Sequence, residues 1–172
     1  MTEEEIKYRS NPKNINEIAK LNFQENIEFQ EYVVQVNSSE LDSIIFQIQQ
    51  EVTNTINCTY CGNCCKSLMI NVETEDKIRL ANHLKISEKE FDEKYIEKSN
   101  SGHLSIMSKI PCHFLDENKC TVYEARPTEC RNFPGLDLPH FSNRLFAFFI
   151  HYEKCPIVFY SIEKLKTKLN FK

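Results

Sequence analysis

The sequence predicts a small single domain of the α+β class, in which helices, short strands and a β-hairpin surround a cysteine site for a metal ion or cluster. Residues 39–56 place apolar side chains three or four positions apart, which is the period of an amphipathic helix. Short apolar runs bounded by turn residues follow between positions 67 and 123, as expected for short strands. Four of the eight cysteines lie within eight residues, a spacing that points to metal ligation.

Length and charge set the outline of the protein. A chain of 172 residues is expected to form one domain, and 41% hydrophobic residues are enough for a modest core. We expect a partly helical N-terminal arm at 1–40, a cysteine-cluster metal-binding domain at 41–157, and a C-terminal helix at 158–172 that packs on the domain or extends from it. The net charge of −4 argues against a nucleic-acid partner, because no positive surplus is available to neutralise phosphates.

Capping signals mark the helices of the first half. Ser39 and Asp42 resemble a capping pair at the start of the helix at 39–56, and Ser87 with Glu90 forms a capping box. The other elements expected here are a strand at 67–72, a helix from Thr74 to about Lys85, a short helix after Ser87, a break at 99–102 and a strand at 103–107.

The segment between Cys112 and Cys120 predicts a β-hairpin. A three-residue loop at 116–118 would pair Leu115 with Lys119. Cys112 and Cys120 would then point to the same face, as shared ligation requires, whereas a loop of two or four residues would put them on opposite faces. We favour the three-residue loop.

The last third of the chain predicts one more strand and a terminal helix. The expected elements are a short helical turn at 124–131, a loop at 134–139, a strand at 145–150 and a helix at 157–169. The lysines of this last region, at 164, 166, 168 and 172, are expected to form a solvated face.

The compartment decides how the cysteines are interpreted. Eight cysteines would suit a disulfide-stabilised interaction protein, which is the main alternative. The N-terminus is acidic and lacks the apolar region of an export signal, and the longest apolar run, at 145–150, is far too short to span a bilayer. We therefore expect a cytoplasmic protein without a membrane span, in which a reducing environment favours metal binding.

The cysteine run is the strongest chemical signal. Cys58, Cys61 and Cys64 repeat the Cys-x2-Cys step, which brings sulfurs close enough to share a metal or a cluster edge. Gly62 permits the turn between them. The adjacent Cys65 is expected to aim its sulfur elsewhere. Eight sulfurs with one vicinal pair thus predict two four-thiolate sites, or one site with spare thiols.

The identity of the metal stays open at this point. Three close cysteines and a remote Cys155-Pro156 are typical of iron–sulfur ligation, and tetrahedral zinc accepts the same sulfurs. Thiol–disulfide exchange at Cys61 and Cys64 is a weaker alternative, because eight cysteines exceed what exchange needs. Arg126 and Arg131 flank Cys130; they either stabilise thiolate charge or recognise an anion, or else form ordinary ion pairs with Glu124 or Glu129. His113 is a further candidate ligand that eight sulfurs do not require.

The combined pattern resembles a known family. It consists of the run from Cys58 to Cys65, Pro111-Cys112-x-Phe-Leu, Cys120-x-Val-Tyr, Arg126-Pro-x-x-Cys-Arg-x-Phe-Pro, and the region near Cys155. Over about residues 55 to 157 the chain resembles the YkgJ-like cysteine-cluster proteins, the zinc- or iron-chelating CxxCxxCC domain. The resemblance implies metal chelation by these cysteines. A related pattern occurs in flagellin lysine methylases, where it is associated with an iron–sulfur cluster.

We therefore predict a metal-binding protein with no identified catalytic residues. It would hold an iron–sulfur cluster, for example 4Fe–4S, or zinc, with an electron-transfer or accessory role and a protein partner of unknown identity. A protein-modifying enzyme related to flagellin lysine methylases and a structural zinc module are the alternatives. The proposed ligands are Cys58, Cys61, Cys64, Cys65, Cys112, Cys120, Cys130 and Cys155.

Overall fold

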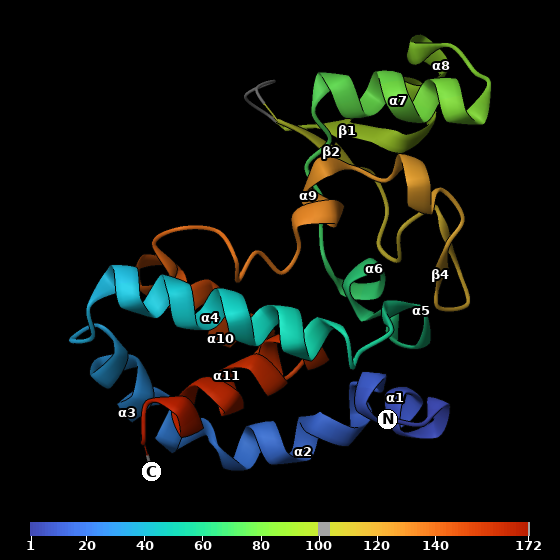
Figure 1. The fold of residues 1–172 in the computed structure, drawn as a ribbon. Coiled ribbons are helices and arrows are strands. Elements are labelled where there is room, and N and C mark those ends of the chain that lie inside the picture. The colour runs from blue at the N-terminus through green and yellow to red at the C-terminus, as the bar shows by residue number, and fades with distance from the viewer. Residues whose placement is uncertain (100–103, 172) are drawn as a thin grey trace. The chain divides into compact units, whose positions relative to one another are not determined.

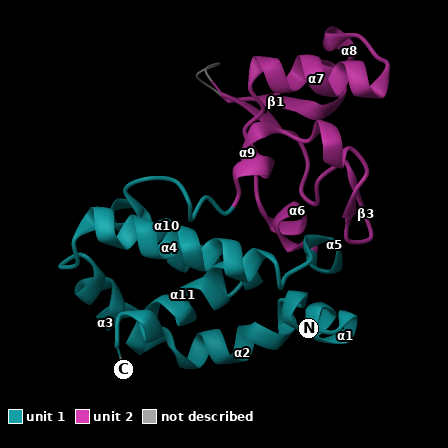
Figure 2. Cartoon of the chain, viewed as in Figure 1, with its two compact units in different colours: residues 1–61, 134–172 teal, residues 62–133 magenta. Residues whose placement is uncertain are grey.

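The computed structural model describes residues 1–99 and 104–171. Its chain divides into two compact units, unit 1 formed by residues 1–61 and 134–172 and unit 2 formed by residues 62–133 (Figure 2). Helices predominate, and the four short strands of the described residues all lie in unit 2. The predicted α+β class is confirmed. Most of the predicted break at 99–102, together with His103, lies outside the described residues.

Unit 1 is built from helices (Figure 1). They are α1 (Glu3–Ser10), α2 (Lys13–Leu21), α3 (Phe23–Val33), α4 (Ser38–Thr53), α5 (Cys58–Cys61), the 3-10 helix η2 (Phe141–Arg144), α10 (Leu145–Tyr152) and α11 (Pro156–Lys168). Helix α11 packs against α4 and α10. The core of the unit draws buried side chains from α2, α3, α4, η2, α10 and α11, among them the fully buried Phe29, Leu41, Ile45, Ile162 and Leu165. Burial of this apolar surface is the main term that stabilises the unit.

The start of α4 differs in detail from the prediction. Asn37 is the N-cap, and its side-chain oxygen accepts hydrogen bonds from the backbone N–H groups of Ser39 and Glu40 at 3.1 and 3.2 Å. The predicted pairing of Ser39 with Asp42 is therefore wrong. The Asp42 carboxylate instead accepts from the backbone N–H groups of His140 and Phe141, at 2.8 and 2.9 Å, and so fastens the start of η2 to α4.

The apolar run at 145–150 is a helix, so the predicted strand is wrong. Leu145, Phe148 and Tyr152 are buried, and they recur at the three- to four-residue spacing of a helical face. Phe146 and Ile150, between them, are 76% and 46% exposed. A short run of uniformly apolar residues carries no period of its own, so packing against neighbours, such as Phe141 stacked on Phe148 at 4.9 Å, decides its conformation.

The terminal helix is confirmed, and its lysines are not all solvated. Lys166 is 3% exposed, which contradicts the prediction of a fully solvated lysine face. Its ammonium lies 2.8 Å from a carboxylate oxygen of Glu25 and 2.8 Å from one of Glu163. Two carboxylates at this distance compensate the loss of water around a buried ammonium. Lys172 lies outside the described residues.

Unit 2 combines short helices with two antiparallel strand pairs. Its elements are α6 (Asn63–Ser67), α7 (Thr74–Leu84), α8 (Glu88–Tyr95), β1 (Ile96–Lys98), β2 (Ser105–Met107), β3 (Leu115–Asp116), β4 (Lys119–Cys120), the 3-10 helix η1 (Tyr123–Ala125) and α9 (Thr128–Asn132). A separate core fills this unit, with Leu80 and Phe91 fully buried at its centre. Strand β1 pairs with β2 through Glu97 and Ile106.

Two strand predictions in unit 2 need correction. The segment at 67–72 forms no regular strand, and its ladder is limited to a single bridge between Asn71 and Ile106. In the hairpin, Leu115 pairs with Cys120 and Asp116 with Lys119, so the loop has two residues rather than three. The predicted register is therefore wrong. The loop length also does not decide whether Cys112 and Cys120 point to the same face. Cys112 lies before β3, so the alternation of side chains along the strand does not set its direction.

Capping of the helices in unit 2 is largely as predicted. The Ser87 hydroxyl accepts from the N–H of Glu90 at 3.2 Å, and the Glu90 carboxylate accepts from the N–H of Ser87 at 2.8 Å, which confirms the capping box. Helix α7 forms as predicted, but Thr74, the expected cap, is its first residue. The N-cap is Glu73, whose N–H donates to the Asp76 carboxylate at 3.4 Å.

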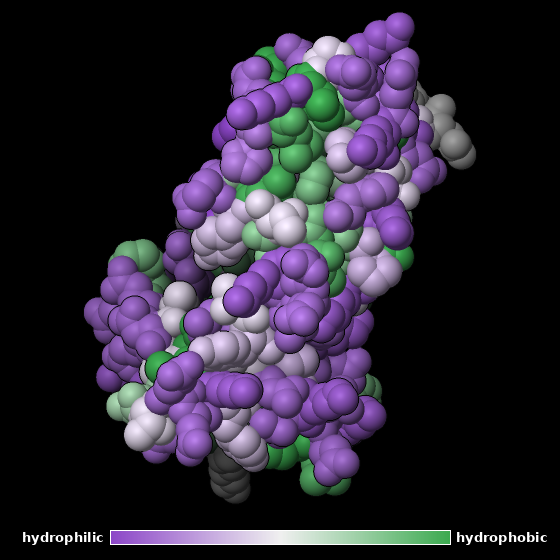
Figure 3. All heavy atoms as spheres, turned by 90° about the vertical axis from the view of Figure 1, so that its right-hand side faces the viewer, coloured by the Kyte–Doolittle hydropathy of each residue, from purple (hydrophilic) through white to green (hydrophobic). Residues whose placement is uncertain are grey.

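The surface agrees with the composition. Hydrophilic residues cover most of the face drawn in Figure 3, interrupted by patches of hydrophobic residues. Of the helices formed by the described residues, none combines the length and the apolar character that crossing a membrane requires.

Candidate metal centre

The first half of the cysteine run is the short helix α5, which α1 holds in place. The Asn57 side-chain oxygen accepts from the N–H and the hydroxyl of Thr59, at 2.9 and 2.7 Å, and so caps the helix that carries Cys58 and Cys61. The N–H of Asn57 donates to the Ser10 hydroxyl at 2.8 Å, which ties this cap to the end of α1. These local bonds orient the Cys-x2-Cys step.

Gly62 makes the turn into α6, as predicted. Its φ of +62° lies in the left-handed region that favours glycine. A Cβ atom at this position would lie 2.9 Å from the Cα of Asn118 and 3.0 Å from its carbonyl oxygen. Conformation and close approach to the hairpin loop therefore both require glycine here. Lys66, on α6, donates to the Asn118 side chain and ties the same two segments together.

Unit 2 brings five cysteines together from four separate segments. Cys64 and Cys65 have sulfurs 4.0 Å apart, so the expectation that Cys65 aims its sulfur away from Cys64 is wrong. The N–H of Cys112 donates to the carbonyl of Cys65 at 2.8 Å, which joins the start of the hairpin to α6. We call the following set the unit 2 thiol group: Cys64, Cys65, Cys112, Cys120 and Cys130.

The members of the unit 2 thiol group influence one another electrostatically. Hydrogen bonding between Cys64 and Cys65 lowers the pKa of Cys64 and raises that of Cys65. Burial, and to a smaller extent negative charge on Cys64, raises the pKa of Cys112, Cys120 and Cys130, that of Cys130 to about 12. The group thus resists carrying several thiolates at once without a cation, because like charges in a partly buried site repel.

Unit 1 holds the other three cysteines. Burial, together with the charges of Cys61 and Cys58, raises the pKa of Cys155 to about 12. Cys155 is half-buried directly before Pro156, the first residue of α11. Cys58, Cys61 and Cys155 therefore form a second set, the unit 1 thiol group, in which the remote cysteine accompanies the first Cys-x2-Cys step.

The thiols of each group lie in one region of their unit, but they are not arranged as the ligands of a metal ion. In the part of the chain that the structure describes, no three His, Cys, Asp or Glu side chains are already arranged to hold a metal ion. The described cysteines are present as thiols rather than disulfides. Thiolates are soft ligands that suit zinc and iron, so the chemistry of both groups fits either metal.

Both arginines beside Cys130 bind backbone carbonyls. Arg126 lies over the Tyr123 ring at 3.7 Å and donates to the carbonyl of that residue at 2.7 Å. Arg131 donates to the carbonyls of Arg126 and Glu124. The predicted alternative of ion pairs with the Glu124 or Glu129 carboxylates is therefore not what fixes these side chains. The charge of Arg126 lowers the pKa of Cys120, so this arginine does favour the thiolate there.

His113 lies beside the unit 2 thiol group but interacts elsewhere. Its Nε2 atom is 3.0 Å from the Ser108 hydroxyl, and its ring meets the edge of Tyr95 with centroids 5.1 Å apart. Burial, together with the charges of Lys109 and Lys94, lowers the pKa of His113. These contacts show that His113 packs against Tyr95 and Ser108 and give it no observed role as a metal ligand.

Three residues that position the thiols were not identified from the sequence. Asp76 accepts from Thr128 at the start of α9, Asn118 contacts Gly62, and Glu129 accepts from the N–H of Asn71. Each acts across more than 50 positions. The spacing of residues along the chain does not predict such contacts. An acidic residue on an otherwise apolar helix face, such as Asp76, does indicate that a hydrogen-bond partner lies opposite it, because buried polar groups are hydrogen-bonded.

Comparison with known proteins agrees with this site. The family model described as "Putative zinc- or iron-chelating domain" (CxxCxxCC) matches residues 57–156, more than half of the chain. An uncharacterized protein of Methanocaldococcus jannaschii is 33% identical over 81 residues, which is 45% of this chain and 43% of the relative. The match thus spans less than half of that relative's length. No solved structure matches the chain.

Proposed function

We propose that this chain, which belongs to the CxxCxxCC family of zinc- or iron-chelating domains, binds metal through two groups of cysteine thiols, one in each compact unit. In unit 2 the ligands would come from Cys64, Cys65, Cys112, Cys120 and Cys130. In unit 1 they would be Cys58, Cys61 and Cys155. Each group draws its sulfurs from segments of its unit that are far apart in the sequence, so bound metal would cross-link the unit.

The distance between the sulfurs of Cys64 and Cys65 carries the proposal for unit 2. Two thiolates on one tetrahedral zinc ion, with bonds of about 2.3 Å, are about 3.8 Å apart. The observed 4.0 Å is close to that edge. In a 4Fe–4S cluster each cysteine binds a separate iron, so the sulfurs spread farther apart. The vicinal pair therefore supports one metal ion, zinc or iron, that is shared by both sulfurs and completed by two of the other three thiols, in preference to a 4Fe–4S cluster.

An iron–sulfur cluster is the second candidate, and the unit 1 thiol group favours it. Cys58 and Cys61 carry the close spacing of cluster ligands, and Cys155 is a remote cysteine followed by proline. The charges of Cys58 and Cys61 act on Cys155, which supports a common neighbourhood. A cluster at these thiols would give the protein an electron-transfer or accessory role.

The role that fits a single ion in unit 2 is structural. The five thiols join α6, the segment before the hairpin, β4 and α9, which are short elements with a small core. Small domains of this kind gain stability when a metal ties their segments together, because binding free energy adds to folding free energy. We propose a reducing, cytoplasmic setting, in which such thiols remain available for metal.

Anaerobic purification followed by metal analysis and an absorption spectrum tests the proposal. A colourless protein with stoichiometric zinc would support the single ion, and a brown protein with iron and acid-labile sulfide would support the cluster. If neither metal is retained under reducing conditions, the proposed function fails. Cadmium or cobalt substitution adds a direct measurement, because thiolate-to-metal charge-transfer absorption counts the sulfur ligands.

Variants separate the two groups. Cys65→Ser should remove the unit 2 metal and leave the unit 1 thiols intact, whereas Cys155→Ser should do the reverse. Met69→Ser is a matched control, because this exposed residue lies four positions from Cys65 and carries a sulfur that is not a thiolate. Loss of all metal in both cysteine variants would contradict two independent groups.

A further inference from the structure

Unit 1 contains a cavity of about 490 Å³ between α3 and α10. This is a common size for a site that takes a small organic molecule. Apolar side chains form part of its wall, and polar or charged side chains form the rest, namely those of Lys20, Asn26, Gln30, Glu153 and Lys154. The lining also includes Ala19, Phe23, Ile27, Ile150 and Tyr152. All of the proposed metal ligands are absent from this lining.

Asn26 supplies a buried acceptor without a donor among the residues of this lining. The residue is 5% exposed, and its Oδ1 atom is buried without a hydrogen-bond partner. Its backbone carbonyl is satisfied by the Gln30 side chain at 3.2 Å. A buried side-chain oxygen that has lost water and gained no donor is unfavourable, and a donor group of a ligand would remove this cost.

Tyr152, beside Asn26, is already fully engaged. Its hydroxyl donates to Glu163 at 2.5 Å and accepts from the side chain of Asn22 at 3.0 Å. Glu163 in turn lies 2.8 Å from the Lys166 ammonium. This network holds the tyrosine in one position, which leaves Oδ1 of Asn26 as the acceptor that a ligand can use.

The apolar wall is exposed at its rim. Phe23 is 68% exposed and Ile150 is 46% exposed, and Ile27 is 37% exposed on the same helix as Asn26. Exposed apolar side chains around a cavity are typical of a ligand-binding entrance. A molecule that covers them would bury apolar surface and reach Asn26.

We propose that this cavity binds a small molecule with a flat or branched apolar body and one N–H or O–H group that donates to Oδ1 of Asn26. The body would contact Phe23, Ile27 and Ile150. The site is independent of the proposed metal chemistry, because it uses none of the cysteines.

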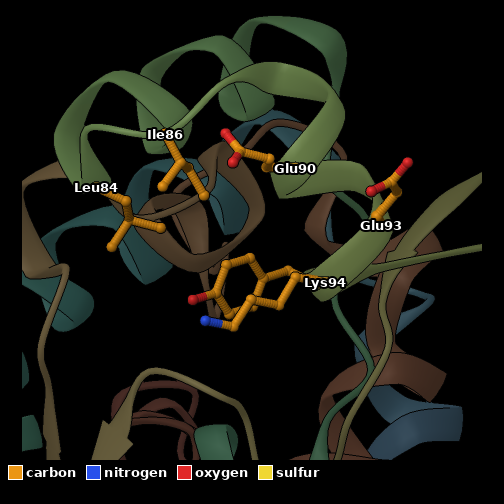
Figure 4. A pocket seen from close by; sticks show the side chains of 6 residues that line it. Leu84, Ile86, Glu90, Glu93 and Lys94 are labelled. Atoms are coloured by element: carbon orange, nitrogen blue, oxygen red, sulfur yellow. The ribbon is translucent and has the colours of Figure 1, made fainter.

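A second cavity, in unit 2, lacks the features that carry this proposal. It measures about 480 Å³ and is lined by Leu84, Ile86, Glu90, Glu93, Lys94 and Tyr95 (Figure 4). Glu90 is committed to the capping box with Ser87, and the Lys94 ammonium lies 5.2 Å from the centre of the Tyr95 ring. Among these six residues, none has a buried polar atom that lacks a hydrogen bond.

A pair of probes tests the proposal on the full chain. Indole and 1-methylindole share one ring system, and only indole has an N–H donor. Methyl NMR signals of Ala19, Ile27 and Ile150 would be followed during titration with each probe. We expect saturable shifts at these methyls and about a three- to tenfold tighter binding of indole, the range of one net hydrogen bond. No saturable binding, or equal affinities for the two probes, would overturn the proposal.

A variant of the acceptor gives the sharper test. Asn26→Leu removes the oxygen and keeps the branching and the number of heavy atoms of the side chain, so the indole preference should fall to about one while 1-methylindole still binds. Gln30→Leu is the matched control, because Gln30 lines the same cavity one turn away and its side chain donates to a backbone carbonyl. The preference should persist in this control. If Asn26→Leu retains the preference, the assignment of Asn26 is wrong, and if it does not fold, the probe comparison in the unmodified chain still decides.

Discussion

The carboxylate of Asp76 accepts hydrogen bonds from both the backbone N–H and the hydroxyl group of Thr128, at 2.8 to 3.1 Å. Helix α9 begins at Thr128 after Pro127, which provides no side-chain cap. Asp76, from α7, therefore supplies the cap from a distance. Because α9 carries Cys130, this contact positions one of the proposed metal ligands. Asp76 is 1% exposed and is also bound by Arg79.

Asp76→Asn should destabilise the protein by about 2–4 kcal/mol, because a buried, hydrogen-bonded carboxylate is replaced by an amide that cannot satisfy the same donors. Urea unfolding measures the change. Glu75→Gln, at the neighbouring exposed position of the same helix, is the control and should change stability by less than about 0.5 kcal/mol. Equal effects of the two substitutions would contradict the assigned role of Asp76.

The stabilisation by Asp76 should depend on pH. Burial alone would raise the pKa of Asp76, but hydrogen bonds from Thr128 and Arg79 outweigh it and lower the pKa. The contribution is therefore complete above the unfolded-state value of about 3.9 and is lost as the pH falls through the lower folded-state value. The difference in unfolding free energy between the unmodified chain and Asp76→Asn should be constant from about pH 5 to 7 and shrink below about pH 4. A difference that grows on acidification would refute this sign.

Gly62→Ala should cost about 1–3 kcal/mol, because φ is positive and the added Cβ meets the backbone of Asn118. Gly62→Asn separates the two causes, since asparagine tolerates the left-handed region better than alanine but carries the same Cβ. If the close approach dominates, thermal unfolding should show similar losses for both variants. A nearly neutral Gly62→Asn would mean that only φ matters.

Lys166→Met should destabilise by about 1–3 kcal/mol, because the partly buried carboxylates of Glu25 and Glu163 lose their cation. Lys164→Met is the matched control on the same helix. Lys164 pairs with Glu51 at an exposed position, and such pairs contribute about 0–1 kcal/mol. Chemical denaturation of both variants checks the difference, and equal losses would show that the burial of Lys166 has no energetic consequence.

Short-range patterns in the sequence predict part of the fold correctly. The apolar stripe at 39–56 and the Ser87–Glu90 capping box are short-range patterns, and the helices α4 and α8 form as these patterns indicate. The glycine at 62 was identifiable because a tight turn between cysteines needs a positive φ.

The features that were predicted wrongly are those that depend on contacts between residues far apart in the sequence. The run at 145–150 has no period, and packing on Phe141 selects a helix. The hairpin loop differs by one residue from the expected length, which moves every pair in the register. Lys166 is buried because Glu25, far away in sequence, lies opposite it. The spacing of residues along the chain does not indicate which distant residues will be in contact.

The central claim, that the cysteines bind metal in two groups, is tested most directly by metal content per chain in cysteine variants. The protein and the variants Cys64→Ser/Cys65→Ser and Cys58→Ser/Cys61→Ser would be purified anaerobically, checked for folding by circular dichroism, and analysed by mass spectrometry for zinc and iron. We predict that each double variant loses the metal of its own group and keeps that of the other. Unchanged metal content in both folded variants, or no zinc or iron in the unmodified chain, would contradict the claim.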